Sequence, residues 1–517
     1  MQWRVRAAFL VLTCTGSVGI YFGYNIIGAT APNLEVAPYH LDSESIGGLA
    51  AAYSIPNMVM PLFGGFITDR LGVRLATVIY SAVVALGAAC FWLTLGHHAD
   101  ELSPELRLNC MLASMAIFGL GGESLTVAQK AMLASWFKDS KDFPQLAFAT
   151  GLTLTFGYIG VVINRWTVPA IAVDSVPQAY LLNVVVCAGS CVSMIVASWL
   201  HHRVSKEDTQ ADLADKNSKL GENLLSPVDE DPAPAPEELI EEELSAAGQC
   251  TDAVREFCTG IRSLPRPFFV LCAMLAISSP LFACFETFGP AVLVDAWGYD
   301  IEAADEITSV AQLSGLILMP AIGMLYDAKG HRLAGASMGC VIFALSWLAL
   351  TVGSSMGAPS GTPLGSTVGV ALAASLFFGG TWPCVPLLVE EHLVGTAFGF
   401  MTAAQNTCLS IVLVGAGEMR DATGGFDAMG SGLALLGAIS TILGGVVWRM
   451  WTKSQADIEE KVQAESGENP LSKDALEAPE VAADAGADNE RRHTLHSLSP
   501  RGRGDCAQQL PPQQQPQ

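Results

Sequence analysis

The sequence predicts an all-α membrane protein in which twelve transmembrane helices form two pseudo-symmetric bundles of six. Hydrophobic residues make up 51% of the 517 residues and charged residues only 15%, whereas an average soluble domain carries roughly 25% charged residues. Apolar runs of about 20 residues, the length that crosses a bilayer, recur along the chain. One short charged turn also appears twice, 258 positions apart, which indicates a duplicated architecture.

The apolar runs fall into two groups of six, separated by a polar segment. The first group covers residues 7–30, 45–67, 75–97, 108–133, 145–171 and 178–201, and the second covers residues 267–290, 303–326, 333–354, 364–389, 395–418 and 428–451. We therefore expect an N-terminal six-helix bundle over residues 1–203 and a C-terminal one over residues 265–453. Lys and Arg collect in the loops on one side, which predicts that both termini are cytosolic.

Two polar segments carry most of the net charge of −23. Residues 206–262 contain 15 acidic and 5 basic residues, and residues 455–517 contain 12 acidic and 6 basic residues. Such composition is typical of chains that bury no core. We predict a disordered acidic cytosolic linker over residues 204–264 and a disordered cytosolic tail over residues 454–517. An acidic dileucine pair in the linker is either a sorting signal or a chance occurrence; it consists of Glu222, Leu224 and Leu225.

The repeated turn runs from Gly65 to Arg74 and again from Gly323 to Arg332. The offset pairs Asp69 with Asp327, each at the end of an apolar run. A carboxylate at that place can cap the free N–H groups of a helix arriving from the other bundle, and the natural recipient of Asp69 is the helix start near 395–396. An alternative is that the turn only fixes topology. The residues predicted to form gates are Gly65, Asp69, Arg70, Gly72, Arg74, Asp327, Lys329 and Arg332.

The turn from Asp69 to Arg74 is also the signature of the major facilitator superfamily, which implies the fold of that superfamily. The stretches 119–129, 135–138 and 391–401 resemble one family within it, that of major facilitator superfamily domain-containing protein 1. The similarity covers residues from about 10 to 450. It implies a lysosomal dipeptide uniporter that works with a heavily glycosylated single-span accessory subunit.

Glu123 and Glu286 are acidic residues that lie inside predicted spans. A carboxylate at membrane depth is costly and faces a cavity or a partner, so we expect both to line the substrate site. The resemblance implies that Glu123 holds the ammonium of a peptide, whereas the alternative is an ion pair with Lys130, seven residues along the same helix face. Glu286 could bind a substrate cation, take up a proton, or serve only helix packing.

A zwitterionic peptide also needs a cation for its carboxylate. The resembling family has an arginine at the position of Tyr158, so this chain departs from the family there. Arg165 follows seven residues later, about 10 Å nearer the lumen, and either reaches inward or anchors the interface. Neutral polar and aromatic residues that we expect to complete the substrate site are Tyr24, Asn25, Asn57, Gln405, Asn406 and Trp382.

The leading functional hypothesis is export of dipeptides from lysosomes by alternating access. A transporter of another amine-bearing or organic-anion solute, with or without proton coupling, is the first alternative, and a non-transporting membrane sensor or scaffold is the second. No nucleophile–base pair or metal-type spacing is apparent, so we expect neither an enzyme nor a metal or cofactor. The expected partners are the dipeptide, the lipid bilayer and the accessory subunit; a homodimer stays open, and no nucleic acid is expected.

Overall fold

The computed structural model describes residues 3–36, 38–95, 103–138, 140, 144–223 and 246–466, and every element among them is helical. Within these ranges, eleven helices are long and apolar enough to cross a membrane. A twelfth span consists of two segments, Ser45–Met58 and Met60–Leu71, with a bend of 49° between them. The predicted all-α membrane fold is therefore confirmed.

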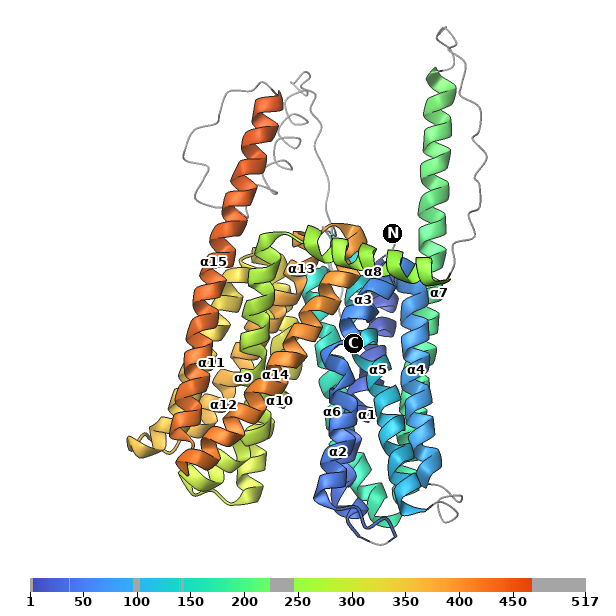
Figure 1. Ribbon diagram of the computed structural model, residues 1–517. Coiled ribbons are helices and arrows are strands. Elements are labelled where there is room, and N and C mark those ends of the chain that lie inside the picture. Colours follow the sequence, from blue (N-terminus) through green and yellow to red (C-terminus); the bar gives the residue numbers. More distant parts are fainter. Residues whose placement is uncertain are drawn as a thin grey trace, which may run out of the picture. The chain divides into compact units, whose positions relative to one another are not determined.

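The N-terminal bundle is built around α1, which contacts both α6 and α7, while α4 contacts α5 and α7 (Figure 1). Pro56 starts a short 3₁₀ turn that interrupts the second span, as proline does when it follows a helix that it cannot continue. The elements of this bundle are α1 (Trp3–Leu34), α2 (Ser43–Ser54), η1 (Pro56–Met58), α3 (Met60–Leu71), α4 (Val73–Leu95), α5 (Pro104–Phe137), α6 (Leu146–Asp174) and α7 (Val176–Asn223).

The C-terminal bundle follows α8 (Ala246–Ser263). In it α11 contacts α12, and α14 contacts α9. Pro383 lies in a second 3₁₀ turn, so Pro56 and Pro383 each lie at an interruption of a helix. The elements of this bundle are α9 (Arg266–Trp297), α10 (Ile301–Lys329), α11 (Arg332–Ser355), α12 (Thr362–Thr381), η3 (Trp382–Cys384), α13 (Val385–Leu388), η4 (Glu391–Leu393), α14 (Val394–Thr423) and α15 (Asp427–Ser466).

The segment predicted to be a disordered linker contains helix at both ends. Helix α7 continues to Asn223 and α8 covers Ala246–Ser263. In α8, Phe257 and Ile261 lie one helical turn apart and form an apolar stripe that the charge count does not reveal. The disorder expected for the linker as a whole stays a prediction. Leu224 and Leu225 of the dileucine pair lie outside the described residues. Residues Met1–Lys453 form one compact unit, and Ser454–Gln517 form another.

The two bundles meet at one end, which we call the gate face. Asp69, in the last turn of α3, accepts hydrogen bonds from the backbone N–H groups of Gly395 (2.7 Å) and Thr396 (2.6 Å) in the first turn of α14. The N-cap residue of α14 is Leu393, whose side chain offers no cap. The other bundle therefore supplies the acceptor that this helix start lacks. The contact matches the one predicted from the sequence.

The second copy of the turn makes the equivalent contact in the opposite sense. Asp327, near the end of α10, accepts hydrogen bonds from the N–H groups of Ala147 (3.0 Å) and Phe148 (2.8 Å) at the start of α6. Gln145 at the N-cap of α6 makes no side-chain cap. Arg332 lies 3.2 Å from the same carboxylate. The gate face is thus held by two related contacts, each joining both bundles.

Glycines let the two bundles approach closely beside these contacts. A methyl group on Gly65 would collide with the carbonyl oxygen of Gly395 and would lie 3.1 Å from the Cα of Gly399. A side chain on Gly323 would meet the backbone of Ala147 in the same way. Since a larger residue would separate the helices, glycine is required where α3 crosses α14 and where α10 crosses α6.

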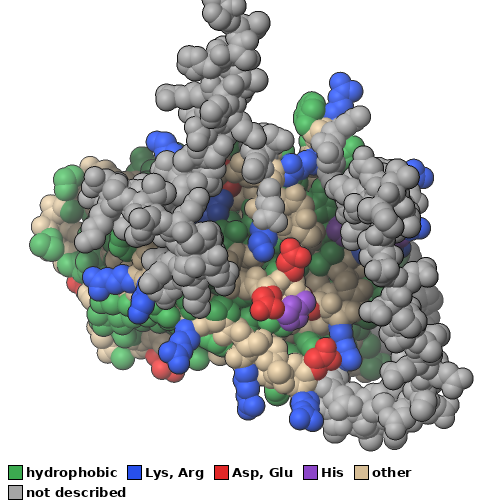
Figure 2. Space-filling model, turned by 90° about the horizontal axis from the view of Figure 1, so that it is seen from above, with side chains coloured by type: hydrophobic (Ala, Val, Ile, Leu, Met, Phe, Trp, Pro, Cys, Tyr) green, Lys and Arg blue, Asp and Glu red, His purple; other side chains and the backbone are tan. Residues whose placement is uncertain are grey.

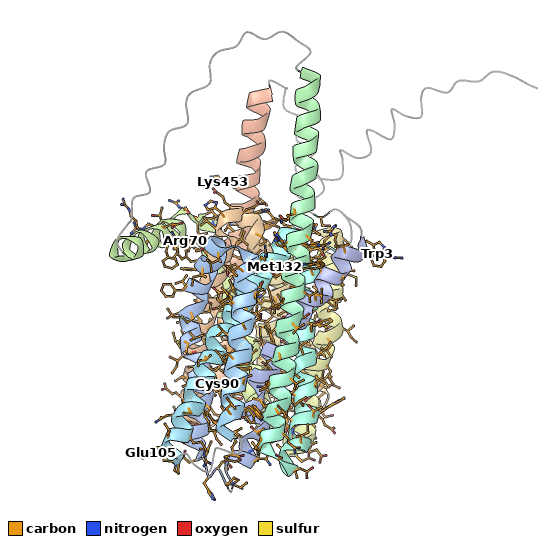
Figure 3. All side chains as sticks on the ribbon, turned by 90° about the vertical axis from the view of Figure 1, so that its right-hand side faces the viewer. Trp3, Arg70, Cys90, Glu105, Met132 and Lys453 are labelled. Carbon is orange, nitrogen blue, oxygen red and sulfur yellow. The ribbon has the colours of Figure 1, made fainter. Side chains whose placement is uncertain are left out.

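The ends of the bundles differ in their side chains. Figure 3 shows Trp3, Arg70 and Lys453 at the gate face, and Glu105 at the opposite face. Figure 2 views the gate face, where Lys and Arg side chains surround a smaller group of acidic side chains and a histidine. Helix α5 runs from Glu105 toward the gate face, so residues later in α5 lie nearer the gates.

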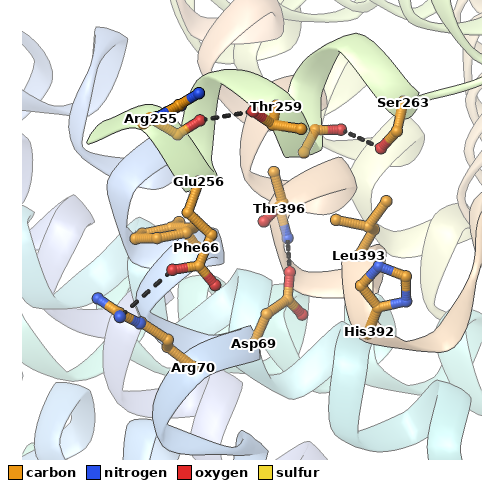
Figure 4. Close-up of a pocket in the computed structure, with 11 residues that line it drawn as sticks. Phe66, Asp69, Arg70, Arg255, Glu256, Thr259, Ser263, His392, Leu393 and Thr396 are labelled. Carbon is orange, nitrogen blue, oxygen red and sulfur yellow. Dashed lines mark hydrogen bonds and ion pairs between the residues drawn. The ribbon is translucent and has the colours of Figure 1, made fainter. Parts of the chain in front are cut away.

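Helix α8 lies over the Asp69 gate and contacts both bundles (Figure 4). Glu256 forms an ion pair with Arg70 at 3.3 Å, and the ring of Phe257 packs against that of Phe66 at 5.4 Å between centroids. On the other bundle, Leu393 lies beside α8 at Gly260. A hollow of about 750 Å³ remains between α8 and the gate. The helix therefore covers the seam where α3 meets α14.

Replacing Gly65 with leucine should destabilise the closed gate face. The added side chain overlaps the backbone of Gly395, and overpacking of this kind typically costs about 1–3 kcal/mol. The measurement is thermal unfolding of the purified protein in detergent, where Gly65→Leu should melt at a lower temperature. Gly28→Leu is the matched control, because no atom lies within 4 Å of the added group there. Equal melting of both variants would contradict the close approach.

Replacing Phe257 with alanine should loosen α8. The variant loses the apolar contact with Phe66. If the burial of this ring contributes roughly 1.4 kcal/mol to the binding of α8, its loss raises the population of the detached helix about tenfold. Trypsin, which cleaves after Arg255 and Arg262, should then cut the variant faster. The control is Cys258→Ala, because Cys258 is exposed on the same helix. An unchanged cleavage rate in Phe257→Ala would show that this ring does not hold α8.

Candidate functional site

A cavity of about 410 Å³ lies between the two bundles. Its walls come from α1, α5 and α6 on one side and from α9, α10, α12, η3 and α14 on the other. Nine of the ten residues predicted for the substrate site line it, namely Tyr24, Asn25, Glu123, Tyr158, Arg165, Glu286, Trp382, Gln405 and Asn406. Residues from both halves of the sequence therefore converge on one site.

The cavity opens away from the gate face. Along α1, Ser17 is buried but Tyr24, farther from the gate face, is 50% exposed. Along α9, Ser279 is buried but Glu286 is exposed, and Arg165 on α6 is exposed too. All five line the cavity. Among the described residues, the exposed part of the lining therefore lies on the side away from the Asp69 and Asp327 contacts.

Glu123 projects into the cavity from the middle of α5. Its carboxylate accepts two long hydrogen bonds, from the hydroxyl groups of Tyr53 and Thr126, both at 3.4 Å. Among the described residues no cation lies within salt-bridge distance of it. The alternative of an ion pair with Lys130 is therefore wrong for this conformation. The carboxylate retains the capacity to accept stronger hydrogen bonds from a ligand.

Lys130 instead contacts the other bundle. Its ammonium lies 3.4 Å from the centroid of the indole ring of Trp382, in the geometry of a cation–π interaction. Trp382 is 3% exposed and also packs against Phe398. The contact joins α5 to η3 at the gate side of the cavity. Lys130 lines the cavity, although the sequence reasoning treated it only as a partner for Glu123.

Glu286 occupies the other wall. Its carboxylate accepts a hydrogen bond from the side-chain amide of Gln312 at 2.8 Å. Gln312 was missed by the sequence reasoning, although a glutamine within the apolar run 303–326 is the type of signal that could have found it. Arg165 makes no hydrogen bond or ion pair within the described part of the chain. The wide side of the cavity thus offers one carboxylate and one guanidinium, from opposite bundles.

Tyr158 stands among aromatic side chains. Its ring lies 6.2 Å from that of Tyr21 in the same bundle and 6.3 Å from that of Phe282 in the other, measured between centroids. It lines the cavity with a neutral phenol. This position supplies aromatic surface and one hydroxyl group, and no positive charge.

The structure does not bring Asn57 to the cavity. The residue is 2% exposed, and its side-chain amide donates to the carbonyl oxygen of Tyr53 at 2.9 Å, within the bent second span. The backbone carbonyl oxygen of Asn57 accepts a hydrogen bond from the side-chain amide of Asn406 at 3.0 Å. The expectation that the Asn57 side chain lines the site is wrong, because the 3₁₀ turn after Pro56 directs it back toward α2. The backbone here joins the two bundles.

The remaining predicted gate residues lie around the two aspartates. Gly72 ends α3 with φ of 80°, a conformation that glycine adopts without strain. Arg70 pairs with Glu256 of α8, as described above. The side chains of Arg74 and Lys329 are exposed and make no hydrogen bond or ion pair within the described ranges. Their gating roles, and those of the aspartates, stay predictions.

Two residues that line the cavity and carry a buried hydroxyl group without a partner were also missed. Ser279 on α9 is 4% exposed and Thr402 on α14 is 2% exposed, and neither hydroxyl has a hydrogen-bond partner. Both residues line the cavity. Nothing in the sequence separates them from the many Ser and Thr residues that bond to the carbonyl one turn back, such as Thr155. Among the described residues no cluster of His, Cys, Asp and Glu could hold a metal ion.

Comparison with known proteins gives the family. The model of the Major Facilitator Superfamily matches residues 13–415. The chain is 27% identical over 429 residues to a zebrafish (Danio rerio) protein named lysosomal dipeptide transporter MFSD1, covering 81% of each chain. It is 27% identical to the human (Homo sapiens) protein of that name, over 434 residues and again 81% of each.

A solved structure supports the fold. That of the proton:xylose symporter XylE, bound to 6-bromo-6-deoxy-D-glucose, matches with a TM-score of 0.59 at 15% sequence identity, covering 84% of this chain and 94% of the symporter. At that identity the match speaks for the arrangement of helices alone. Together with the paired gates and the central cavity, these matches show that the chain belongs to the Major Facilitator Superfamily and is a membrane transporter of that fold.

Proposed function

We propose that this protein exports dipeptides from lysosomes to the cytosol by alternating access, as a uniporter. The observation that carries the proposal is Glu123, a carboxylate without an ionic partner in the described structure, in a cavity between two bundles. A peptide ammonium offers the three charge-assisted donors that this carboxylate lacks. The relatives named lysosomal dipeptide transporters support the cargo and the compartment.

In this proposal the gate face is cytosolic, and so are both termini. The basic side chains gathered there agree with the positive-inside rule (Figure 2). The conformation with closed gates and an open opposite face is then the one that loads peptide from the lysosomal lumen. Release requires Asp69 and Asp327 to leave the helix starts that they cap, after which the bundles rock apart at the cytosolic side.

Transport without ion coupling is consistent with the charge of the cargo. A dipeptide with neutral side chains is a zwitterion of net charge zero at neutral pH, because its ammonium and carboxylate cancel. Its movement carries no net charge, so neither a membrane potential nor a proton is needed. Neutral groups such as Asn25, Gln405 and Asn406 suit the central amide, which looks the same in every dipeptide.

A second candidate keeps the fold and changes the cargo to another amine-bearing or organic-anion solute, with proton coupling as a variant. The observation that favours it is Tyr158, whose phenol gives the centre of the site no positive charge. Ligand-induced thermal stabilisation separates the two, since only a true ligand raises the melting temperature. A sensor or scaffold fits less well, because a protein that never rocks has no need of paired gates. The accessory subunit and a homodimer stay proposals.

Replacing Glu123 with glutamine should abolish dipeptide transport. The amide keeps the shape of the side chain but loses the charge that binds an ammonium. Purified protein in liposomes should accumulate a labelled dipeptide such as Ala-Ala, and Glu123→Gln should reduce the initial rate by at least about tenfold, the effect of roughly 1.4 kcal/mol. Glu418→Gln, at an exposed position of α14 outside the cavity, is the matched control. Full transport by Glu123→Gln would remove Glu123 from the mechanism.

Uniport predicts that a pH gradient does not drive uptake. With equal dipeptide on both sides of the liposome membrane, an imposed gradient should produce no accumulation, because no proton accompanies the zwitterion. The measurement is labelled dipeptide content over time, with and without the gradient and with a protonophore as control. Accumulation against the peptide gradient, abolished by the protonophore, would establish proton coupling instead.

A further inference from the structure

We propose that Lys130 binds the carboxylate of the dipeptide, so that both ends of the substrate are held by one helix. This assignment rests on the proposed function and specifies its site. Glu123 would hold the ammonium and Lys130, two turns nearer the gates on the same face of α5, would hold the carboxylate. The hydroxyl group of Thr402, from the other bundle, would donate a hydrogen bond to the same carboxylate.

The polar groups of the cavity lie at three depths. Measured along each helix from its gate-face end at 1.5 Å per residue, Lys130 and Thr402 lie about 10–12 Å deep, and Glu123 and Ser279 about 20 Å deep. Arg165 and Glu286, the charged groups at the open side of the cavity, lie about 28–30 Å deep on the same scale. The cavity floor therefore carries one cation, and the level above it carries one carboxylate.

The separation of Glu123 and Lys130 fits a dipeptide. Seven residues on a helix span about 10 Å and return to nearly the same face. An extended dipeptide measures about 6 Å from its terminal nitrogen to its terminal carboxyl carbon. Adding a charge-assisted hydrogen bond of about 2.8 Å at each end gives roughly 12 Å between the two binding groups. Long, flexible side chains accommodate the difference, whereas a single amino acid would be too short to reach both.

Lys130 is available for a ligand. Within the described residues its ammonium makes no hydrogen bond or salt bridge; it packs against the ring of Trp382 and interacts with the Glu123 carboxylate only at longer range. A ring face attracts the charge but satisfies its three N–H donors poorly. A carboxylate that entered the cavity would be the stronger partner. Trp382 thus holds the ammonium in this conformation.

The unpartnered hydroxyl groups point to the same pose independently. Thr402, buried and without a partner at the depth of Lys130, can donate a hydrogen bond to a carboxylate oxygen. Ser279, buried and unpartnered at the depth of Glu123, can accept from an ammonium. Both residues line the cavity at the two expected depths, so a ligand of matching polarity would give their hydroxyl groups the hydrogen-bond partners that buried hydroxyl groups normally have.

Arg165 is the rival cation, and its position argues against it. It lies on the open side of the cavity at about the depth of Glu286, close to 8 Å farther from the gates than Glu123 by the helical rise. A peptide that used Arg165 would extend from Glu123 toward the exit and leave the floor groups unused. Lys130 and Thr402 would then stay without polar partners.

The test compares Ala-Ala with Ala-Ala amide, which lacks the terminal negative charge. Binding is measured as the ligand concentration that gives half-maximal thermal stabilisation of the purified full chain. The wild type should bind the acid about tenfold or more tightly than the amide, because the amide loses a charge-assisted contact. In Lys130→Gln the two ligands should bind about equally, and Lys130→Arg should restore the preference. Stabilisation of Lys130→Gln by the amide, as in the wild type, shows that this variant is folded.

Arg165→Gln distinguishes the rival. The Arg165→Gln variant should keep the preference for the acid over the amide. Loss of this preference in Arg165→Gln, or its persistence in Lys130→Gln, would overturn the assignment to Lys130. Neither result would contradict dipeptide transport. Binding of neither ligand by the wild type, with no dipeptide uptake in liposomes, would overturn the proposed function and this assignment with it. The two failures are therefore distinguishable.

Discussion

The architecture depends on one interaction used twice, an aspartate of one bundle capping a helix start of the other. The first N–H groups of α14 and α6 have no acceptor within their own helices, and their N-cap residues, Leu393 and Gln145, provide none. An unsatisfied donor at a buried helix end is costly. Asp69 and Asp327 remove that cost only while the gate face is closed. In the proposed alternating access, the closed state is therefore stabilised by contacts whose N–H groups would have to hydrogen-bond to water in the open state.

This constraint also explains where the cavity lies. Glycines at the crossings of α3 with α14 and of α10 with α6 bring the bundles into backbone contact near the gates. The helices of the two bundles touch near the gate face and separate from one another toward the opposite face, so the space between the bundles widens in that direction. On α9, Ser279 is buried, whereas Glu286, which lies nearer the opposite face, is exposed. This change in exposure agrees with the widening. Gate and cavity are two consequences of the same contact.

Much of this was accessible from the sequence, and the exceptions have physical reasons. The repeated turn identified Asp69 and the helix start that it caps, because a charged residue between apolar runs is rare and this one recurs at the equivalent position of the second half. The cavity acids stood out for the same reason. Asn57 was misplaced because a 3₁₀ turn changes the side chain's direction in a way that helical periodicity cannot show. Ser279 and Thr402 were missed because only the packing reveals which hydroxyl group lacks a partner.

The division of labour between the bundles bears on how a loaded site can move. Glu123 and Lys130 both belong to α5, and a helix keeps its length when bundles rock as rigid bodies. In the proposed transport cycle, the distance between Glu123 and Lys130 would therefore be the same in the lumen-facing and cytosol-facing states. Trp382, Ser279 and Thr402 belong to the other bundle, so contacts with them change on rocking. In this proposal, helix α5 would select the length of the substrate. The change in affinity that releases the peptide would come from the C-terminal bundle, whose contacts with the peptide change on rocking.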